Sequence, residues 1–315
     1  ALRARSSRAS QSLRLTKRPG LCEPLFIMSS IREIASLGEI AGDYDAILCD
    51  VWGVVHDGKA AFPEAAAAMA RFRAERGPIL LLSNAPRPGE SVVEMLDQFG
   101  VAREAYDGIL TSGDATRAEV QRRAGQSFFH LGPDRDRVVW AGLDAVEAKP
   151  DSAAYILCTG LFDDEREGPD DYRDRLAAMR ERGLPMICAN PDIKVHRGTR
   201  LIWCAGAVAA AYEALGGDVT YFGKPHPPVY DEALKRLSAL AGRSLDPRSV
   251  LAVGDGLPTD ILGANRAGVD SLLITAGILA DRFGAAPDLP DAKRVAAELD
   301  GADLFATAFQ PRLKW

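Results

Sequence analysis

Short apolar runs alternate with amphipathic stretches along the chain from about residue 44. The apolar runs, such as AILC, ILLL and VLAVG, are continuous, which is typical of strands covered on both faces. Strands that alternate with helices predict βαβ units and a mainly parallel sheet. We therefore predict an α/β fold, a Rossmann-like doubly wound parallel sheet. The expected strands are 46–50, 78–84, 107–113, 127–132, 153–160, 184–190, 219–224, 249–255 and 271–277.

The first 27 residues lack this alternation. They hold six Lys or Arg, one acid (Glu23) and no apolar core. Two interpretations compete: an Arg- and Ser-rich targeting peptide, or sequence translated upstream of a start at Met28. Residues 28–40 read as a helix with a serine cap, which favours the second. In either case we exclude residues 1–27 from the fold.

Composition narrows the class of protein further. The chain has 315 residues, is 47% hydrophobic and carries a net charge of −6, so it can bury the core of a globular protein, and no basic face for nucleic acid is implied. No apolar run is long enough for a membrane span. The cysteine count is odd, without CxxC spacing, and Cys49, Cys158 and Cys188 lie inside apolar runs. These features predict buried free thiols in a reducing compartment, here the cytoplasm.

Four of the expected strands end in polar residues: Asp50, Ser83 with Asn84, Lys224, and Asp255, which Asp260 follows. In a doubly wound sheet the carboxyl ends of the strands form the ligand site. Carboxylates, a hydroxyl and an ammonium at one edge suit a divalent cation together with a phosphate. Asn84 and Asp260 alone could be ordinary cap or turn residues, and Lys224 before a proline could lie on the surface. Asp50 and Asp255 are harder to explain in this way, because neither opens a helix at once. The order and spacing of all these residues together carry the inference.

These segments resemble a known family. DVWGV, LLSN, GKPHPPVY and GDGLPTDILGANRAG are similar to the four ordered motifs of the haloacid dehalogenase superfamily, and ICANPD to its class IIA branch. The resemblance covers about residues 40–285. It implies a catalytic core of this family over residues 28–116 and 206–315. It also implies an inserted α/β cap domain of the C2 type over residues 117–205, which can support a homodimer.

The resemblance assigns the central chemistry to Asp50. This carboxylate would attack the phosphorus of a small phosphorylated metabolite, a sugar phosphate, nucleoside monophosphate or similar, and form an aspartyl-phosphate. A Mg²⁺ ion would be held by Asp50, the backbone carbonyl of Trp52 and Asp255. Asp260 would act behind these ligands or through water.

Three further polar residues would hold the transferring group by the same resemblance. Ser83 would donate to a phosphoryl oxygen, helped by the amide of Asn84. Lys224 would neutralise charge on the phosphoryl group and on the nucleophile.

Trp52 departs from the pattern. Phosphatases of this family usually carry a second aspartate there, as the general acid and base, and an indole can serve as neither. Three outcomes are open. Another group, namely His56, Asp57 or His226, takes the proton; the substrate has a good leaving group, such as an acyl phosphate; or turnover is slow.

Two rival functions follow from the same position. Dehalogenases of the superfamily carry an aromatic residue there and displace halide from carbon without a metal, but Asp255 and Asp260 favour a metal site. A weakened member could instead act as a ligand-binding or regulatory protein. The intact Asp50, Ser83 and Lys224 argue against that alternative.

The cap would supply substrate specificity through residues 190–198, NPDIKVHRG. Asn190, Asp192 and His196 are the candidates to contact the part of the substrate beyond its phosphate. A capped turn after a strand explains the same residues equally well. Positive charge nearby, which would suit an anionic substrate, comes from Lys194, Arg197 and Arg200.

Overall fold

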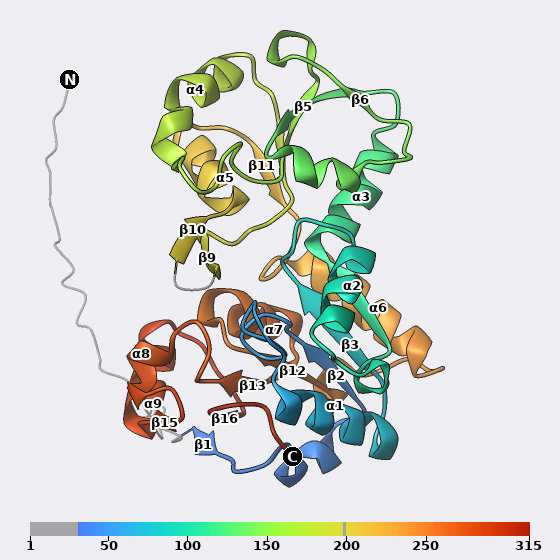
Figure 1. Cartoon of the computed structure of the whole chain (residues 1–315), viewed down its shortest axis with the longest axis vertical. Helices are drawn as coiled ribbons and strands as arrows, with labels where there is room; N and C mark the ends of the chain where they lie inside the picture. Colours follow the sequence, from blue (N-terminus) through green and yellow to red (C-terminus); the bar gives the residue numbers. More distant parts are fainter. Residues whose placement is uncertain (1–30, 198–199) are drawn as a thin grey trace, which may run out of the picture.

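The computed structural model describes residues 31–197 and 200–315. Its core is a seven-stranded sheet, parallel throughout, in the lower half of Figure 1. The strands, in spatial order, are β1 (Arg32–Glu33), β16 (Ala308–Gln310), β13 (Asp270–Ile274), β12 (Val250–Gly254), β2 (Ala46–Cys49), β3 (Ile79–Ser83) and β4 (Gly108–Thr111). The expected doubly wound α/β fold is confirmed.

Helices cover both faces of the core sheet. Successive residues of β2 enter different apolar clusters: Ile47 packs with Met69 of α1, whereas Leu48 packs with Tyr230 of α6. This explains why the strands read as continuous apolar runs. The helices that accompany the core are α1 (Pro63–Glu75), α2 (Gly89–Gln98), α3 (Ser112–Arg122), α6 (Pro227–Leu240), α7 (Leu262–Ala267), α8 (Ala280–Phe283) and α9 (Ala292–Gly301).

A second parallel sheet forms the cap, in the upper half of Figure 1. Its order is β11 (Val219–Tyr221), β8 (Met186–Cys188), β7 (Tyr155–Cys158), β5 (Ser127–Leu131) and β6 (Val146–Glu147). Helices α4 (Arg173–Glu181) and α5 (Ala205–Ala214) pack on it. An antiparallel hairpin, β9 (Lys194–Arg197) with β10 (Arg200–Trp203), projects from the cap toward the core (Figure 1).

Short elements complete the chain. A small antiparallel pair joins β14 (Gly284–Ala286) to β15 (Leu289–Pro290). A π-helix spans Leu257–Ile261. The 3-10 helices span Leu37–Glu39, Ala41–Asp43, Arg103–Ala105, Asp134–Val139, Pro150–Ser152, Pro169–Tyr172 and Pro247–Ser249.

The pairing of the strands places the end of the cap later in the chain than expected. The core was expected to resume at residue 206, but α5 and β11 belong to the cap. Strand β11 pairs with β8, and Val208 and Tyr212 of α5 enter the cap cluster. The side chain of Tyr212 is fully buried there, and its hydroxyl donates to the Leu184 carbonyl at 2.6 Å. The cap therefore extends to the end of β11.

The helix expected over residues 28–40 is not formed in its described part. Strand β1 pairs with β16 instead, and Ser36 caps the 3-10 helix that follows. Ile34 and Leu37 are buried in the core cluster, so packing against the sheet outweighs local helical preference.

Burial confirms the expectation for three of the cysteines. Cys49, Cys158 and Cys188 are buried free thiols. Within the described residues, no helix has the length and apolar character that crossing a membrane requires.

Candidate active site

A cleft of about 1050 Å³ lies between the core and the cap. Its core wall comes from segments that follow β2, β3, β12 and β13, and its cap wall from segments that follow β5, β7 and β8. Each of these strands points its carboxyl end at the same space. The expected strand-end residues Asp50, Ser83, Asn84, Lys224, Asp255 and Asp260 all line this cleft.

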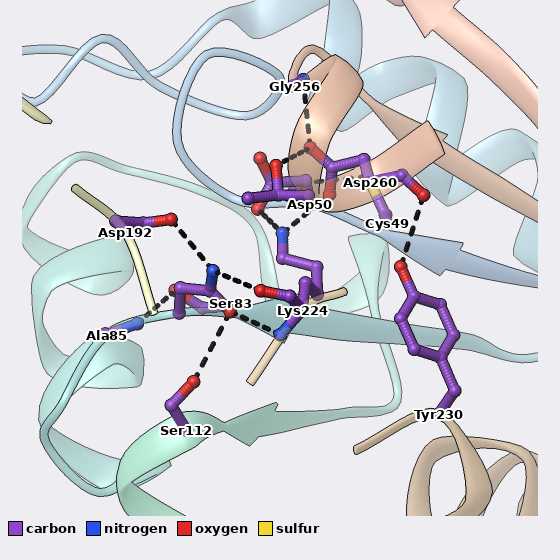
Figure 2. A network of polar contacts seen from close by, with 12 residues as sticks. Cys49, Asp50, Ser83, Ala85, Ser112, Asp192, Lys224, Tyr230, Gly256 and Asp260 are labelled. Atoms are coloured by element: carbon purple, nitrogen blue, oxygen red, sulfur yellow. Dashed lines mark hydrogen bonds and ion pairs between the residues drawn. The ribbon is translucent and has the colours of Figure 1, made fainter. Parts of the chain in front are cut away.

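Asp50, Lys224 and Asp260 line the cleft and form a buried ionic group (Figure 2). The Lys224 ammonium donates to Asp50 Oδ1 at 2.5 Å and to Asp260 Oδ1 at 2.7 Å. The side chains are 4–9% exposed, so water does little to screen the two contacts. The Asp50 backbone N–H donates to the Val253 carbonyl, which ties the end of β2 to β12.

Asp255 completes the carboxylate cluster from the end of β12. The Ile278 backbone N–H donates to its Oδ2 at 2.7 Å, which fixes the side chain. A Cβ atom on Gly277 would lie 2.0 Å from the same oxygen, so only glycine leaves room for this carboxylate. Asp260 is fixed in a similar way, because the Gly256 N–H donates to its Oδ2 at 3.0 Å (Figure 2).

The cluster contains three carboxyl groups and one ammonium, so its acids outnumber its bases. One oxygen each from Asp50, Asp255 and Asp260 lies within 4.8 Å of the others, beside one ammonium. Burial, with repulsion from Asp260, raises the pKa of Asp50 to about 7 against the pull of Lys224. Burial and the two neighbouring carboxylates raise the pKa of Asp255 well above its usual range. Oxygen ligands with uncompensated charge are what Mg²⁺ prefers, so these residues fit the expected metal.

Lys224 stays charged in this setting. Burial alone would lower its pKa, but Asp260 and Asp50 outweigh burial and hold the pKa well above its usual range. The ammonium is therefore a fixed positive charge beside Asp50.

Asn84 joins the core to the cap. Its Nδ2 donates to the Asp192 carboxylate at 2.8 Å and to the Lys224 carbonyl at 3.1 Å. Its Oδ1 accepts from the Lys224 backbone N–H at 2.8 Å. The amide expected to help a phosphate is thus occupied by protein partners. Ser83 is half-buried beside it, and its Oγ accepts from the Ala85 N–H while lining the cleft (Figure 2).

The cap residues expected to contact substrate divide into two groups. Asn190 and Asp192 line the cleft, and Asn190 Oδ1 accepts from the Asp192 backbone N–H, as in a capped turn. Burial raises the pKa of Asp192, opposed by the hydrogen bond from Asn84. His196 lies on β9, paired with Leu201, and its side chain falls outside the described part. The segment expected as a loop is in fact partly a hairpin.

Trp52 lines the cleft two residues after Asp50. The isolated bridge between Trp52 and His56 uses the carbonyls of Val51 and His56. It does not use the Trp52 carbonyl, which is the group expected to bind the metal.

The three groups considered as proton donors differ in access. His56 is fully buried, its Nδ1 accepts from the Gly58 N–H, and burial lowers its pKa to about 4, so it is neutral and out of reach. Asp57 lines the cleft, but backbone N–H groups lower its pKa and keep it ionised. His226 lines the cleft and stacks on Tyr221 with ring centroids 4.9 Å apart. Burial lowers the pKa of His226 too.

Sequence reasoning missed part of the site. The Ile278 N–H acts through the backbone, and Gly277 acts by lacking a side chain, so neither offers a chemical signal. On the cap wall, Asp136 and Thr159 also line the cleft. The only signal for them was their position near the carboxyl ends of expected strands, Thr159 within 153–160 and Asp136 after 127–132.

Comparisons with known proteins agree with this geometry. A family model described as haloacid dehalogenase-like hydrolase matches residues 47–145, and one described as HAD-hydrolase-like matches residues 221–302. A structure of a haloacid dehalogenase-like hydrolase from Brucella suis 1330 is 42% identical, with a TM-score of 0.78, covering 88% of this chain and 98% of that one.

Two further relatives are phosphatases by name. Ribonucleotide monophosphatase NagD of Escherichia coli K12 is 26% identical over 74% of this chain and 88% of its own length. A glycerol phosphate phosphatase of Mycobacterium tuberculosis, solved with calcium, is 26% identical with a TM-score of 0.58, covering 79% of this chain and 71% of that one.

A parallel core with an inserted α/β cap and a carboxylate–lysine cluster at the strand ends defines a class of hydrolase. The chain belongs to the haloacid dehalogenase-like hydrolases, within their class IIA branch.

Proposed function

We propose that this protein is a cytoplasmic Mg²⁺-dependent phosphatase of a small phosphorylated metabolite. The observation that carries the proposal is the buried group of Asp50, Lys224 and Asp260, with Asp255 beside it, lining a cleft large enough for such a substrate. The named phosphatases among the relatives support the same activity.

Asp50 is the nucleophile in this proposal. Its carboxylate attacks phosphorus, the leaving oxygen departs, and water then hydrolyses the aspartyl-phosphate. Lys224 holds one Asp50 oxygen at 2.5 Å and so leaves the other for attack. Ser83, on the wall beside it, donates its hydroxyl to a phosphoryl oxygen.

Mg²⁺ would be held by Asp50, Asp255 and the Trp52 carbonyl, with Asp260 behind them. The cluster fits a divalent cation because three carboxylates face one ammonium. When bound, the ion supplies positive charge that lets an anionic carboxylate approach an anionic phosphate. The same surplus of carboxylates counts against the metal-free dehalogenase alternative.

Phosphate release tests the proposal. The full chain is assayed on phosphate monoesters, acyl phosphates and 2-haloacids, with Mg²⁺ or with a chelator. We expect metal-dependent phosphate release that Asp50→Asn lowers by at least about 10³-fold. Asp43→Asn, an exposed acid away from the cleft, is the matched control and retains activity. Halide release without metal would overturn the proposal.

A further inference from the structure

Trp52 is held rigidly although part of it faces solvent. Its indole is 36% exposed in the cleft. The buried His56 ring packs against it in a T-shaped arrangement, with centroids 5.0 Å apart. A Cβ atom on Gly58 would lie 2.5 Å from Trp52 Cζ2, so the edge of the indole rests directly on that glycine. The Gly58 N–H is bonded in turn to His56 Nδ1, which locks the three residues together.

The cleft that Trp52 lines also holds other exposed apolar side chains. Apolar area that a ligand removes from water contributes to binding. Three such side chains line this cleft from three separate segments: Trp52 is 36%, Ile193 48% and Ile278 42% exposed. A ligand that fits this cleft combines an anionic group with an apolar body.

The chemistry of Trp52 restricts the leaving group as well. An indole N–H is too weak an acid to protonate a departing oxygen, so this position gives no acid catalysis. Without an acid, the leaving oxygen must be stable as an anion. A phenol has a pKa of about 10, far below that of an alkyl alcohol, and is therefore the better leaving group. Phenols and hydroxylated heteroaromatics are also planar, so they can stack on an indole.

We infer that the exposed face of Trp52 binds a planar aromatic leaving group, so that the preferred substrates are aryl or heteroaryl phosphates. This inference rests on the proposed phosphatase function. The Asp50 oxygen bonds to phosphorus while the bond from phosphorus to the aryl oxygen breaks, and its electron pair leaves with the aryloxide. The aryloxide takes a proton from solvent. Water then attacks phosphorus, releases the Asp50 carboxylate and gives its proton to phosphate or solvent.

Binding of non-hydrolysable ligands tests the surface without turnover. Phenylphosphonate and cyclohexylphosphonate have the same number of carbon atoms, but only the first is planar. In calorimetric titrations with Mg²⁺, we expect the wild-type chain to bind phenylphosphonate about tenfold more tightly than cyclohexylphosphonate. Trp52→Ala abolishes this preference and Trp52→Phe retains most of it. Phe305→Ala removes an aromatic ring that is 59% exposed outside the cleft, and changes neither affinity.

Two results would overturn the binding surface. One is equal affinity of the wild-type chain for the two phosphonates. The other is a phenyl preference that survives Trp52→Ala.

Turnover separates this inference from the proposed function. Phenyl phosphate and benzyl phosphate both carry a ring, but only the first releases a phenol. We expect kcat/KM to favour phenyl phosphate by at least about 100-fold, and Trp52→Ala to raise its KM about tenfold. Hydrolysis of both esters at equal rates, unchanged in Trp52→Ala, refutes the inference and leaves the phosphatase standing. Silence on all esters, with a Trp52-dependent phosphonate preference, refutes the phosphatase and supports the binding surface.

Discussion

The molecule contains two parallel sheets, and the carboxyl ends of the strands of both sheets face one cleft. The residues that the two sheets present at this cleft differ. The core edge presents Asp50, Asp255 and Ser83, and the Lys224 ammonium pairs there with Asp50 and Asp260. The cap edge consists of the segments that follow β5, β7 and β8, and it lines the same cleft. There His130 and Thr159 share a hydrogen bond of 2.9 Å.

The cap edge also carries ionisable groups, Arg135, Asp136, Asp164 and Lys194 among them, but within the described residues the group of three close carboxyls lies at the core edge. Burial lowers the pKa of His130 to about 4, so the ring is uncharged near pH 7. Burial raises the pKa of Asp136, which reduces its charge relative to an exposed aspartate. The carboxyl ends of parallel strands thus line the cleft from both domains. In the proposed function the clustered carboxyls and Lys224 of the core carry the reaction, and the cap contacts the rest of the substrate.

Two residues connect the edges. Lys224 follows the cap strand β11 but places its ammonium in the core cluster. Asn84 follows the core strand β3 and bonds both the Lys224 backbone and Asp192 of the cap. The position of the cap is therefore coupled to the position of the key cation.

Removing the ammonium of Lys224 should have the largest effect on the core edge. Lys224→Met leaves two buried carboxylates facing each other without a positive partner. We expect phosphate release to fall by about 10³-fold. The free energy of unfolding without Mg²⁺ should fall by about 3–5 kcal/mol in urea titrations.

Lys235→Met is the matched control for this variant, because that side chain is 81% exposed and its nearest acid contact is 3.9 Å. It should change neither quantity measurably. A Lys224→Met protein that keeps full activity would show that the buried charges of the core edge do not account for phosphate release.

A single added methyl group should weaken the core edge next. Gly277→Ala places a Cβ atom 2.0 Å from Asp255 Oδ2, so the carboxylate must move. We expect Mg²⁺ affinity, measured by calorimetry, to fall about 10–100-fold and activity to fall with it. Gly301→Ala has nothing within 4 Å of the new atom and serves as control. Unchanged Mg²⁺ binding would show that Asp255 is not a ligand.

The sequence predicted most of this core edge. Continuous apolar runs located β2, β3 and β12, and the residue after each run located Asp50, Ser83–Asn84 and Asp255. It placed β11 in the wrong sheet, because three residues between two helices show the same pattern whichever sheet they join. Lys224 was still found, since its position in a motif does not depend on that pairing.

The groups that surround each side chain could not be predicted from the sequence. His56 lies near a polar turn in the sequence, but in the structure it is fully buried and the rings of Trp52 and Phe99 pack against it. The two amide ends of Asn84 are occupied by residues more than 100 positions away, which no local pattern encodes. The role of such a residue depends on its partners, and the sequence around it does not identify them.

The smallest effect is expected at the cap edge. Thr159→Val keeps the shape of the side chain but removes the hydroxyl that bonds His130 Nε2 at 2.9 Å. We expect KM for the preferred substrate to rise several-fold with kcat within about twofold, while stability falls by about 1–3 kcal/mol. Thr220→Val, an exposed position on β11, is the control. A fall in kcat as large as that of Lys224→Met would mean that the cap edge takes part in the reaction chemistry, and the contrast between the two sheets would not hold.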